Sequence, residues 1–258
     1  MEHVVVTIDE QGIALLELNR PDILNVLNLP LLVEAAKALR DLAANERVRA
    51  LIVTGRGRGF CAGADLSAVP GIAAGEPGVG QLVSELMRDH YNPLLLLLHE
   101  FPRPVVSAIN GIAAGGGAGI ALCADLVLAS STAALKIVQV PQLGIVADLG
   151  VNWLLPRIAG RSRALGACLT GETIDATSLH EWGLAWECVE AEQLMPRAYA
   201  LAQQLACLPP ATVLATRRLI DTAADSSFAD ALEAERACQE QLCDTPVFAD
   251  SVRRFLSS

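Results

Sequence analysis

The chain has 258 residues, of which 52% are hydrophobic and 19% charged, so it can bury the core of one large domain and disorder is not expected. Its formal net charge of -10 repels phosphate backbones, which argues against a nucleic-acid-binding protein. Seven cysteines without a CxxC pair, no signal-peptide pattern and no aliphatic run longer than 94–98 predict a cytoplasmic protein without disulfides, a structural zinc site or a membrane span.

The first quarter of the chain predicts a hairpin, a helix and a buried strand. Two β-rich runs, Val4–Ile8 and Ile13–Leu18, flank the turn sequence DEQG. Leucines and alanines at helical spacing predict a helix over 30–44. The apolar run 48–55 predicts a buried strand, and the glycine-rich segment 57–65 after it predicts a loop.

The middle of the chain continues the alternation of strands and helices. Four glycines and a proline within 71–80 predict a mobile surface loop, and a long helix is expected over 79–101, where Pro102 ends it. A strand over 105–109, a glycine triplet with a short helix, and a strand over 126–129 follow. This alternation predicts an α/β fold with parallel strands.

The last third of the chain is predicted to be almost wholly helical. From about residue 162 the only expected strand is a short one over 185–189. The expected C-terminal helices cover 191–207, 210–224 and 228–243.

Two glycine-rich loops, 57–65 and 111–117, each follow a predicted buried strand. Ligands of α/β sheets bind at the carboxyl ends of strands, so the loops can aim two backbone N–H groups at one oxygen. Such an oxyanion hole stabilises a carbonyl that becomes an enolate. The alternative is that both loops are only tight turns between strand and helix. Neither loop carries the signature of a phosphate or dinucleotide site.

Four segments carry a resemblance to a known family: LNRPDILNVLN, GFCAGADL, PVVSAINGIAAGGGAGIALCADLVLA and LPRIAGRSRALGACLTGETIDATSLHEWGLAWECV. In this order, over roughly residues 10 to 200, they resemble the crotonase (enoyl-CoA hydratase/isomerase) superfamily. The resemblance implies a spiral core of ββα units over 1–195 and a C-terminal helical trimerisation region over 196–258. It also implies an acyl-CoA substrate and self-association as a homotrimer or as a hexamer made of two trimers.

The same resemblance implies roles for backbone groups of both glycine loops. The oxyanion donors would be the N–H groups of Ala64, between the Gly and Asp of AGAD, and of Gly116, the middle of the triplet. Asp65 and Asp125 are expected to hold loops through backbone hydrogen bonds rather than to take part in catalysis. The residues expected to contact coenzyme A are Leu24, Ala62, Asp65 and Leu66.

The two glutamates that hydratases of this superfamily use are absent here. By the resemblance their places are occupied by Gly119 and Val140. Adding water across a double bond divides positioning of the water and delivery of a proton between two acid–base groups. Efficient hydration is therefore not expected.

Asp148, in LGIVADLGVNWLLP, is the remaining candidate acid. Its apolar neighbours would raise the pKa of the carboxyl, whereas the N-terminus of a following helix would lower it, and the sequence leaves that balance open. Aspartate is also a preferred N-cap, which gives a purely structural alternative. The resemblance favours catalysis, because several isomerases of the superfamily place an aspartate here, and it is strongest for the epoxyphenylacetyl-CoA isomerase and enoyl-CoA isomerase branch.

The resemblance therefore implies an acyl-CoA isomerase of fatty acid metabolism or phenylacetate catabolism, with one acid and no metal or redox cofactor. Alternatives are a hydratase-type lyase, a dehalogenase or hydrolase in which the aspartate is a nucleophile, and a non-catalytic acyl-CoA-binding subunit. The acyl group itself is not predicted. The residues expected to line its pocket are Met87, His90, Gly119 and Val140, although a lone histidine such as His90 is more often a helix-surface residue.

Overall fold

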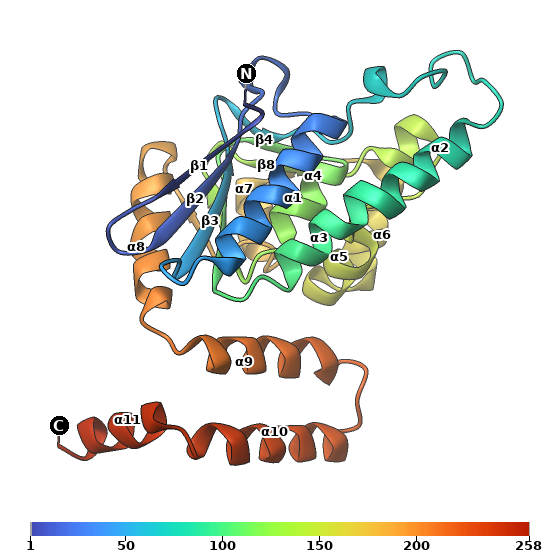
Figure 1. Cartoon of the computed structure of the whole chain (residues 1–258). Coiled ribbons are helices and arrows are strands. Elements are labelled where there is room, and N and C mark those ends of the chain that lie inside the picture. Colours follow the sequence, from blue (N-terminus) through green and yellow to red (C-terminus); the bar gives the residue numbers. More distant parts are fainter. Residues whose placement is uncertain (1, 258) are drawn as a thin grey trace.

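The computed structural model describes residues 2–257, and its core is built around a six-stranded sheet (Figure 1). The predicted hairpin is confirmed, because the first two strands of the sheet pair antiparallel across the DEQG turn. All further pairs in this sheet are parallel. The strands, in their spatial order, are β1 Val4–Ile8, β2 Ile13–Leu18, β3 Ala50–Gly55, β5 Val105–Ile109, β7 Leu126–Ser130 and β10 Glu187–Val189.

A second, smaller sheet runs beside the first and repeats its connections. Each of β3, β5 and β7 leads within a few residues into a short strand of this sheet, which gives three successive ββ units. The prediction of loops was wrong at two of these short strands, because three-residue strands rich in glycine and alanine show no alternation of polar and apolar residues. The strands, in spatial order, are β4 Gly59–Cys61, β6 Ile112–Ala114, β8 Ala134–Lys136 and β9 Ile174–Asp175.

The helices of the core begin and end close to their predicted places. Helix α1, Leu29–Ala44, starts where the Asn28 side chain accepts a hydrogen bond from the Leu31 N–H at 3.0 Å. The predicted long helix comprises α2 Val79–Leu86, a π-helical turn Met87–Tyr91, and α3 Asn92–His99. The later core helices are α4 Gly116–Leu122, α5 Val151–Ala159, α6 Arg161–Thr170, α7 Ala176–Glu181 and α8 Leu194–Ala206.

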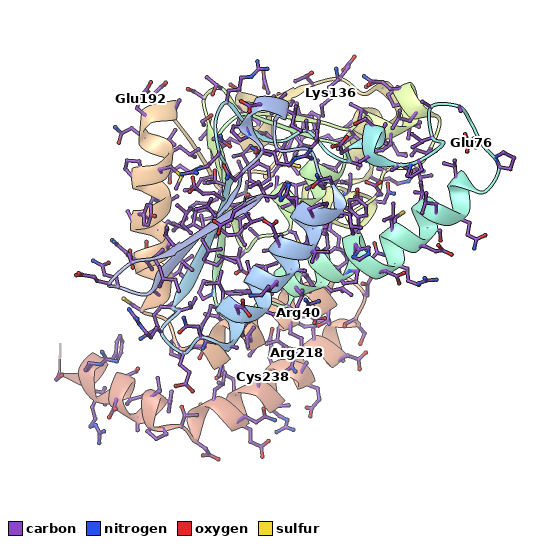
Figure 2. All side chains as sticks on the ribbon, turned by 45° about the horizontal axis from the view of Figure 1, so that its top comes forward. Arg40, Glu76, Lys136, Glu192, Arg218 and Cys238 are labelled. Carbon is purple, nitrogen blue, oxygen red and sulfur yellow. The ribbon has the colours of Figure 1, made fainter. Side chains whose placement is uncertain are left out.

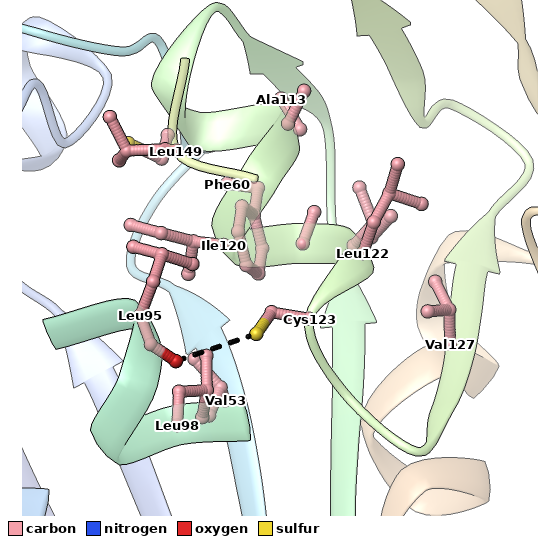
Figure 3. Close-up of a cluster of buried hydrophobic side chains, with 14 of the residues drawn as sticks. Val53, Phe60, Leu95, Leu98, Ala113, Ile120, Leu122, Cys123, Val127 and Leu149 are labelled. Atoms are coloured by element: carbon pink, nitrogen blue, oxygen red, sulfur yellow. Dashed lines mark hydrogen bonds between the residues drawn. The ribbon is translucent and has the colours of Figure 1, made fainter. Parts of the chain in front are cut away.

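Helices cover both faces of the large sheet. On one face, Leu194, Ala198 and Leu201 of α8 pack against Ile52 and Val106. On the other, α1, α3 and α4 bury the larger part of the core, and Figure 3 shows the cluster in which Cys123 donates to the Leu95 carbonyl at 3.7 Å. Because α8 is part of this packing, the helices that leave the core begin after it rather than at residue 196.

Three C-terminal helices extend away from the core (Figure 1). They are α9 Pro210–Ala223, α10 Phe228–Cys243 and α11 Pro246–Leu256, of which the last was not predicted. Cys238 is the one buried residue of these three helices, and the Arg218 guanidinium lies 3.6 Å from its sulfur, between α9 and α10 (Figure 2). Within residues 2–257 no helix combines the length and apolar character needed to cross a membrane.

Arg217 fastens α9 to the core. Its guanidinium donates to both carboxylate oxygens of Asp125 at 2.6 and 2.7 Å and to the carbonyl oxygens of His99, Phe101 and Arg103. Asp125 also accepts from the Val105 N–H at 2.7 Å, which agrees with the structural role expected for it. The carboxylate therefore links the start of β5 to the C-terminal helices.

Candidate active site

A largely apolar cavity of about 210 Å³ lies between the two glycine loops, the α2 segment and the turn before α5. Ala64, Gly116 and Asp148 all line it. Asp148 is the one carboxyl group among the described lining residues, and Tyr91 is the one other titratable side chain. Most of the remaining apolar wall comes from Val69, Ile72, Val83, Leu86, Met87, Leu143 and Ile145.

Two larger hollows lie elsewhere and contain neither glycine loop. One, of about 430 Å³, lies between α9 and the core near Arg217, and the other, of about 580 Å³, lies among α9, α10 and α11. Size alone does not identify a reaction site. The smaller cavity is the candidate because backbone donors and a partly buried carboxyl group converge there.

The two glycine loops are in direct contact. Gly63 has φ of +94°, and a Cβ built on it would lie 2.8 Å from the Ala114 carbonyl oxygen and 3.3 Å from the Gly116 nitrogen. A Cβ on Gly117 would lie only 2.1 Å from the Cys61 carbonyl oxygen. Glycine is required at these positions because any side chain would push the loops apart.

This contact leaves one amide of each loop available for a ligand. The Leu27 N–H donates to the Gly63 carbonyl and the Asp65 N–H donates to the Leu27 carbonyl. In such a parallel bridge the intervening Ala64 N–H faces away from Leu27. Gly116 is the first residue of α4, where the amide has no acceptor within the helix. Both amides belong to residues that line the cavity, as an oxyanion hole requires.

The loop that carries Ala64 is held by a buried network. The Asn25 side chain is fully buried, and its Nδ2 donates to the carbonyl oxygens of Gly59 and Phe60 at 2.9 and 3.1 Å. Arg20 donates to Asp65 at 3.1 Å. The Ser67 hydroxyl and Arg20 together lower the pKa of the Asp65 carboxyl. Asp65 is therefore an anion that fixes the loop.

Asp148 is partly buried in the cavity wall. Its Oδ1 accepts a hydrogen bond from the Gln139 Nε2 at 2.9 Å. Loss of contact with water raises the pKa of the Asp148 carboxyl, while the hydrogen bonds from Gln139 and from its own backbone N–H act in the opposite direction and are weaker. The balance left open by the sequence therefore falls on the side of burial, and a carboxyl with a raised pKa is suited to accept and return a proton.

The structural alternative for Asp148 does not hold. The N-cap of α5 is Gly150, with φ of +79° and no side-chain cap. Asp148 lies two residues earlier, and its carboxylate accepts from Gln139 rather than from the amides that begin the helix. Only the Asp148 backbone carbonyl takes part there, accepting from the Val151 N–H at 3.0 Å.

Gly119 is closed off by the turn that carries Asp148. A Cβ built on Gly119 would lie 1.9 Å from the Leu149 carbonyl oxygen and 3.0 Å from the Leu149 Cβ. Leu149 has φ of +48°, a left-handed conformation that is uncommon for leucine. The backbone of the turn therefore fills the space in which a side chain at position 119 would begin.

Tyr91 has a hydroxyl that is committed to the backbone. The side chain is 8% exposed, and the hydroxyl donates to the Leu27 carbonyl at 3.3 Å. Burial, assisted by the negative charge of Asp148, raises the pKa of Tyr91 to about 12. Tyr91 is therefore neutral near pH 7 and does not compete with Asp148 as a base.

The structure brings together most of the residues predicted for the site. Met87, Ala62 and Leu66 line the cavity together with Asp148 and the two oxyanion donors. The predicted pocket lining needs correction at three places, because His90, Gly119 and Val140 are not among the lining residues. His90 lies on the π-helical turn and Val140 on another such turn before α5. Leu24 and Asp65 also lie outside the lining, and the Leu24 carbonyl accepts from the Ala62 N–H at 2.9 Å.

Sequence reasoning missed Gln139 and Asn25. Gln139 is a single polar residue within the apolar stretch KIVQVP, and Asn25 lies between leucine and valine in DILNVLN. Isolated polar residues in apolar runs are the signal that marks them, because such side chains are buried only when a hydrogen bond holds them.

A mixed α/β fold with these paired strands and this pair of glycine loops defines a class of acyl-CoA enzymes, and the chain belongs to the enoyl-CoA hydratase/isomerase family, whose model matches residues 9–257. The expected crotonase-like fold is confirmed by solved relatives. The enoyl-CoA hydratase from Bacillus anthracis superposes with a TM-score of 0.89 at 28% identity, covering 99% of this chain and 96% of that one.

Two relatives show that the family contains different activities. A 1,2-epoxyphenylacetyl-CoA isomerase from Escherichia coli is 37% identical over 96% of this chain and 93% of its own length. A protein from Rhodobacter capsulatus named a probable enoyl-CoA hydratase is 35% identical over 95% of this chain and 92% of its own length. The family and the class of enzyme are thus established, whereas the choice between isomerase and hydratase depends on the site.

Proposed function

We propose that this protein is an acyl-CoA isomerase in which Asp148 is the single acid–base group. The observation that carries the proposal is that one carboxyl group lines the cavity that also holds the Ala64 and Gly116 amides. Gly119, where a hydratase of the superfamily would carry a glutamate, has no room for a side chain. The likeness to an isomerase from Escherichia coli supports the same choice.

The proposed reaction is a shift of a double bond in a 3-enoyl-CoA. Asp148 removes a proton from C2, the C3–C4 double bond moves to C2–C3, and the negative charge is carried by the thioester oxygen. The Ala64 and Gly116 amides stabilise that oxygen, and one such donor contributes roughly 3 kcal/mol in other enzymes. Asp148 then returns the proton to C4, which leaves a conjugated 2-enoyl-CoA. Proton and charge balance without a further reactant.

The cavity wall favours an apolar acyl group. Apart from Asp148, Gln139, Gln142 and Tyr91, the described lining side chains are apolar or absent. The acyl group of a fatty enoyl-CoA fits this chemistry, and so does the ring of an epoxyphenylacetyl-CoA, whose isomerisation is the second form of the proposed activity. In that reaction the same carboxyl group would assist opening of the epoxide. We also propose that substrate coenzyme A contacts Leu24, Ala62, Asp65 and Leu66.

The first test is the conversion of 3-hexenoyl-CoA by the wild type and by Asp148→Asn. The wild type is expected to form conjugated 2-hexenoyl-CoA, seen as a gain in ultraviolet absorbance, and the variant to be slower by at least about a hundredfold. Glu85→Gln is the matched control, because Glu85 lies on α2 outside the cavity lining and is expected to leave the rate unchanged.

Other outcomes separate the alternatives. A rate that survives Asp148→Asn would place the base elsewhere and overturn the proposal. Hydration of 2-hexenoyl-CoA faster than isomerisation of 3-hexenoyl-CoA would assign the chain to the hydratases, for which the named relatives give the precedent. Binding of coenzyme A without turnover of 3-hexenoyl-CoA or epoxyphenylacetyl-CoA would make the protein a binding subunit.

A further inference from the structure

Gln139 is a buried polar side chain of which only one end is used. It is 3% exposed, and its Nε2 donates to the Asp148 Oδ1 at 2.9 Å. Its Oε1 is buried and has no hydrogen-bond partner within residues 2–257. A buried oxygen without a partner destabilises a protein, and an apolar side chain of similar size would avoid that penalty. The feature that favours glutamine here is therefore its donor end.

The amide of Gln139 lies where the two sides of the cavity meet. A Cβ built on Gly115 would lie 3.6 Å from the Gln139 Nε2, so the amide is adjacent to the loop that carries the Gly116 donor. The Gly115 N–H is fixed to the Lys136 carbonyl at 2.9 Å, and the Gln139 carbonyl accepts from the Ile145 N–H at 3.3 Å. Both ends of the contact therefore belong to ordered backbone.

We propose that Gln139 is a positioning residue that holds Asp148 by Oδ1 and so leaves Oδ2 to carry the proton. The inference rests on the proposed role of Asp148. When the proton leaves C2 of the substrate, it binds to Oδ2, because Oδ1 already accepts the Gln139 N–H. The same oxygen, in the same place relative to the oxyanion amides, then returns the proton to C4. One fixed oxygen thus serves both positions of the 1,3-shift.

The neighbouring titratable groups leave the pH dependence of the reaction to Asp148. Tyr91 and Cys61 each have a pKa raised by burial to about 12, so both are neutral near pH 7. The pKa of Asp65 is lowered by Ser67 and Arg20. Since Asp148 must be ionised to accept a proton, the rate falls as pH falls through its pKa, and this acid limb reports the Asp148 carboxyl.

The test is the pH dependence of kcat for 3-hexenoyl-CoA in the wild type, Gln139→Met and Gln142→Met. Methionine has a similar length to glutamine but no N–H donor. Loss of the donor destabilises the Asp148 anion, so the acid limb of Gln139→Met moves to higher pH, and kcat on the plateau falls about tenfold or more because the carboxylate is no longer held. Gln142 also lines the cavity but makes no printed bond to Asp148, so its variant shifts KM more than the acid limb.

A second variant keeps the test decisive if Gln139→Met folds poorly, which far-UV circular dichroism will show. Gln139→Glu places a second carboxylate beside Asp148, and repulsion between the two is expected to move the acid limb further upward. An acid limb unchanged in folded Gln139→Met or Gln139→Glu would overturn the role of Gln139, while Asp148→Asn would still report on the proposed isomerase. A full rate in Asp148→Asn would remove both.

Discussion

The two sides of the cavity are built from different parts of the chain. The glycine loops contribute backbone amides, and the turn from Gln139 to Gly150 contributes side chains. The amides are placed by close packing of buried strands, as the 2.1 Å approach to a Cβ on Gly117 illustrates. Asp148 is placed by one hydrogen bond in a partly exposed turn. The difference shows that the oxyanion side is rigid by construction, whereas the acid–base side can be altered one side chain at a time.

The largest effect on stability is expected from Gly117→Ala, on the rigid side. The added methyl group would press against the Cys61 carbonyl in buried strand β4, which has nowhere to move. Overpacking of this kind costs about 3 kcal/mol in the free energy of unfolding, measurable by urea denaturation. Gly166→Ala in α6 is the matched control, since no atom lies within 4 Å of its Cβ and alanine favours the helix. Equal stability of both variants would contradict the comparison.

A smaller loss is expected from Gly119→Ala, where the two sides touch. Its methyl group would meet the Leu149 carbonyl, which belongs to a turn that is free to shift outward. The free energy of unfolding should fall by about 2 kcal/mol, and kcat should fall with it because the shift displaces Asp148. Retention of wild-type kcat alongside the lower stability would show that the position of Asp148 does not depend on this contact.

The smallest effect is an increase in stability from Asp148→Asn. The pKa of Asp148 is higher in the folded protein than in the unfolded chain, so between these two values the folded state binds more protons. The free energy of unfolding of the wild type therefore decreases as pH rises through this window and stays lower above it. Asparagine does not titrate, so the variant should be the more stable protein at pH 7.

Urea denaturation at several pH values checks this sign. The difference between Asp148→Asn and the wild type should shrink when pH falls below the unfolded pKa of aspartate, where the wild-type carboxyl is protonated in both states. A wild type more stable than the variant at pH 7 would mean that the Gln139 hydrogen bond outweighs burial, and that the turn is not the more weakly optimised side of the site.

The sequence predicted the glycine loops, the acid and most of the large sheet because each has a local pattern. Val105–Ile109 was predicted to the residue, since prolines and an apolar run bound it. The contact of α8 with the sheet was not predicted, because an amphipathic helix does not show which surface covers its apolar face. Arg217 likewise reads as one of two adjacent arginines on a helix, and only the fold brings Asp125 within 2.6 Å of it.

Within the site, the sequence located Asp148 but not the group that orients it. The nine residues between Gln139 and Asp148 form a π-helical turn and a bend, and no simple periodicity relates their side chains. The pocket lining was wrong at Gly119 for a related reason. Its direction depends on a left-handed Leu149, which no propensity favours.

The contact between Gly119 and the Leu149 carbonyl also restricts how this chain can evolve. A single substitution that introduces a glutamate at position 119 would clash with the turn before it could add a second acid. The turn would have to be rebuilt first, and rebuilding it displaces Asp148 and with it the activity under selection. Descendants of this chain therefore have an easier route to new acyl groups, through the apolar wall, than to a two-acid reaction.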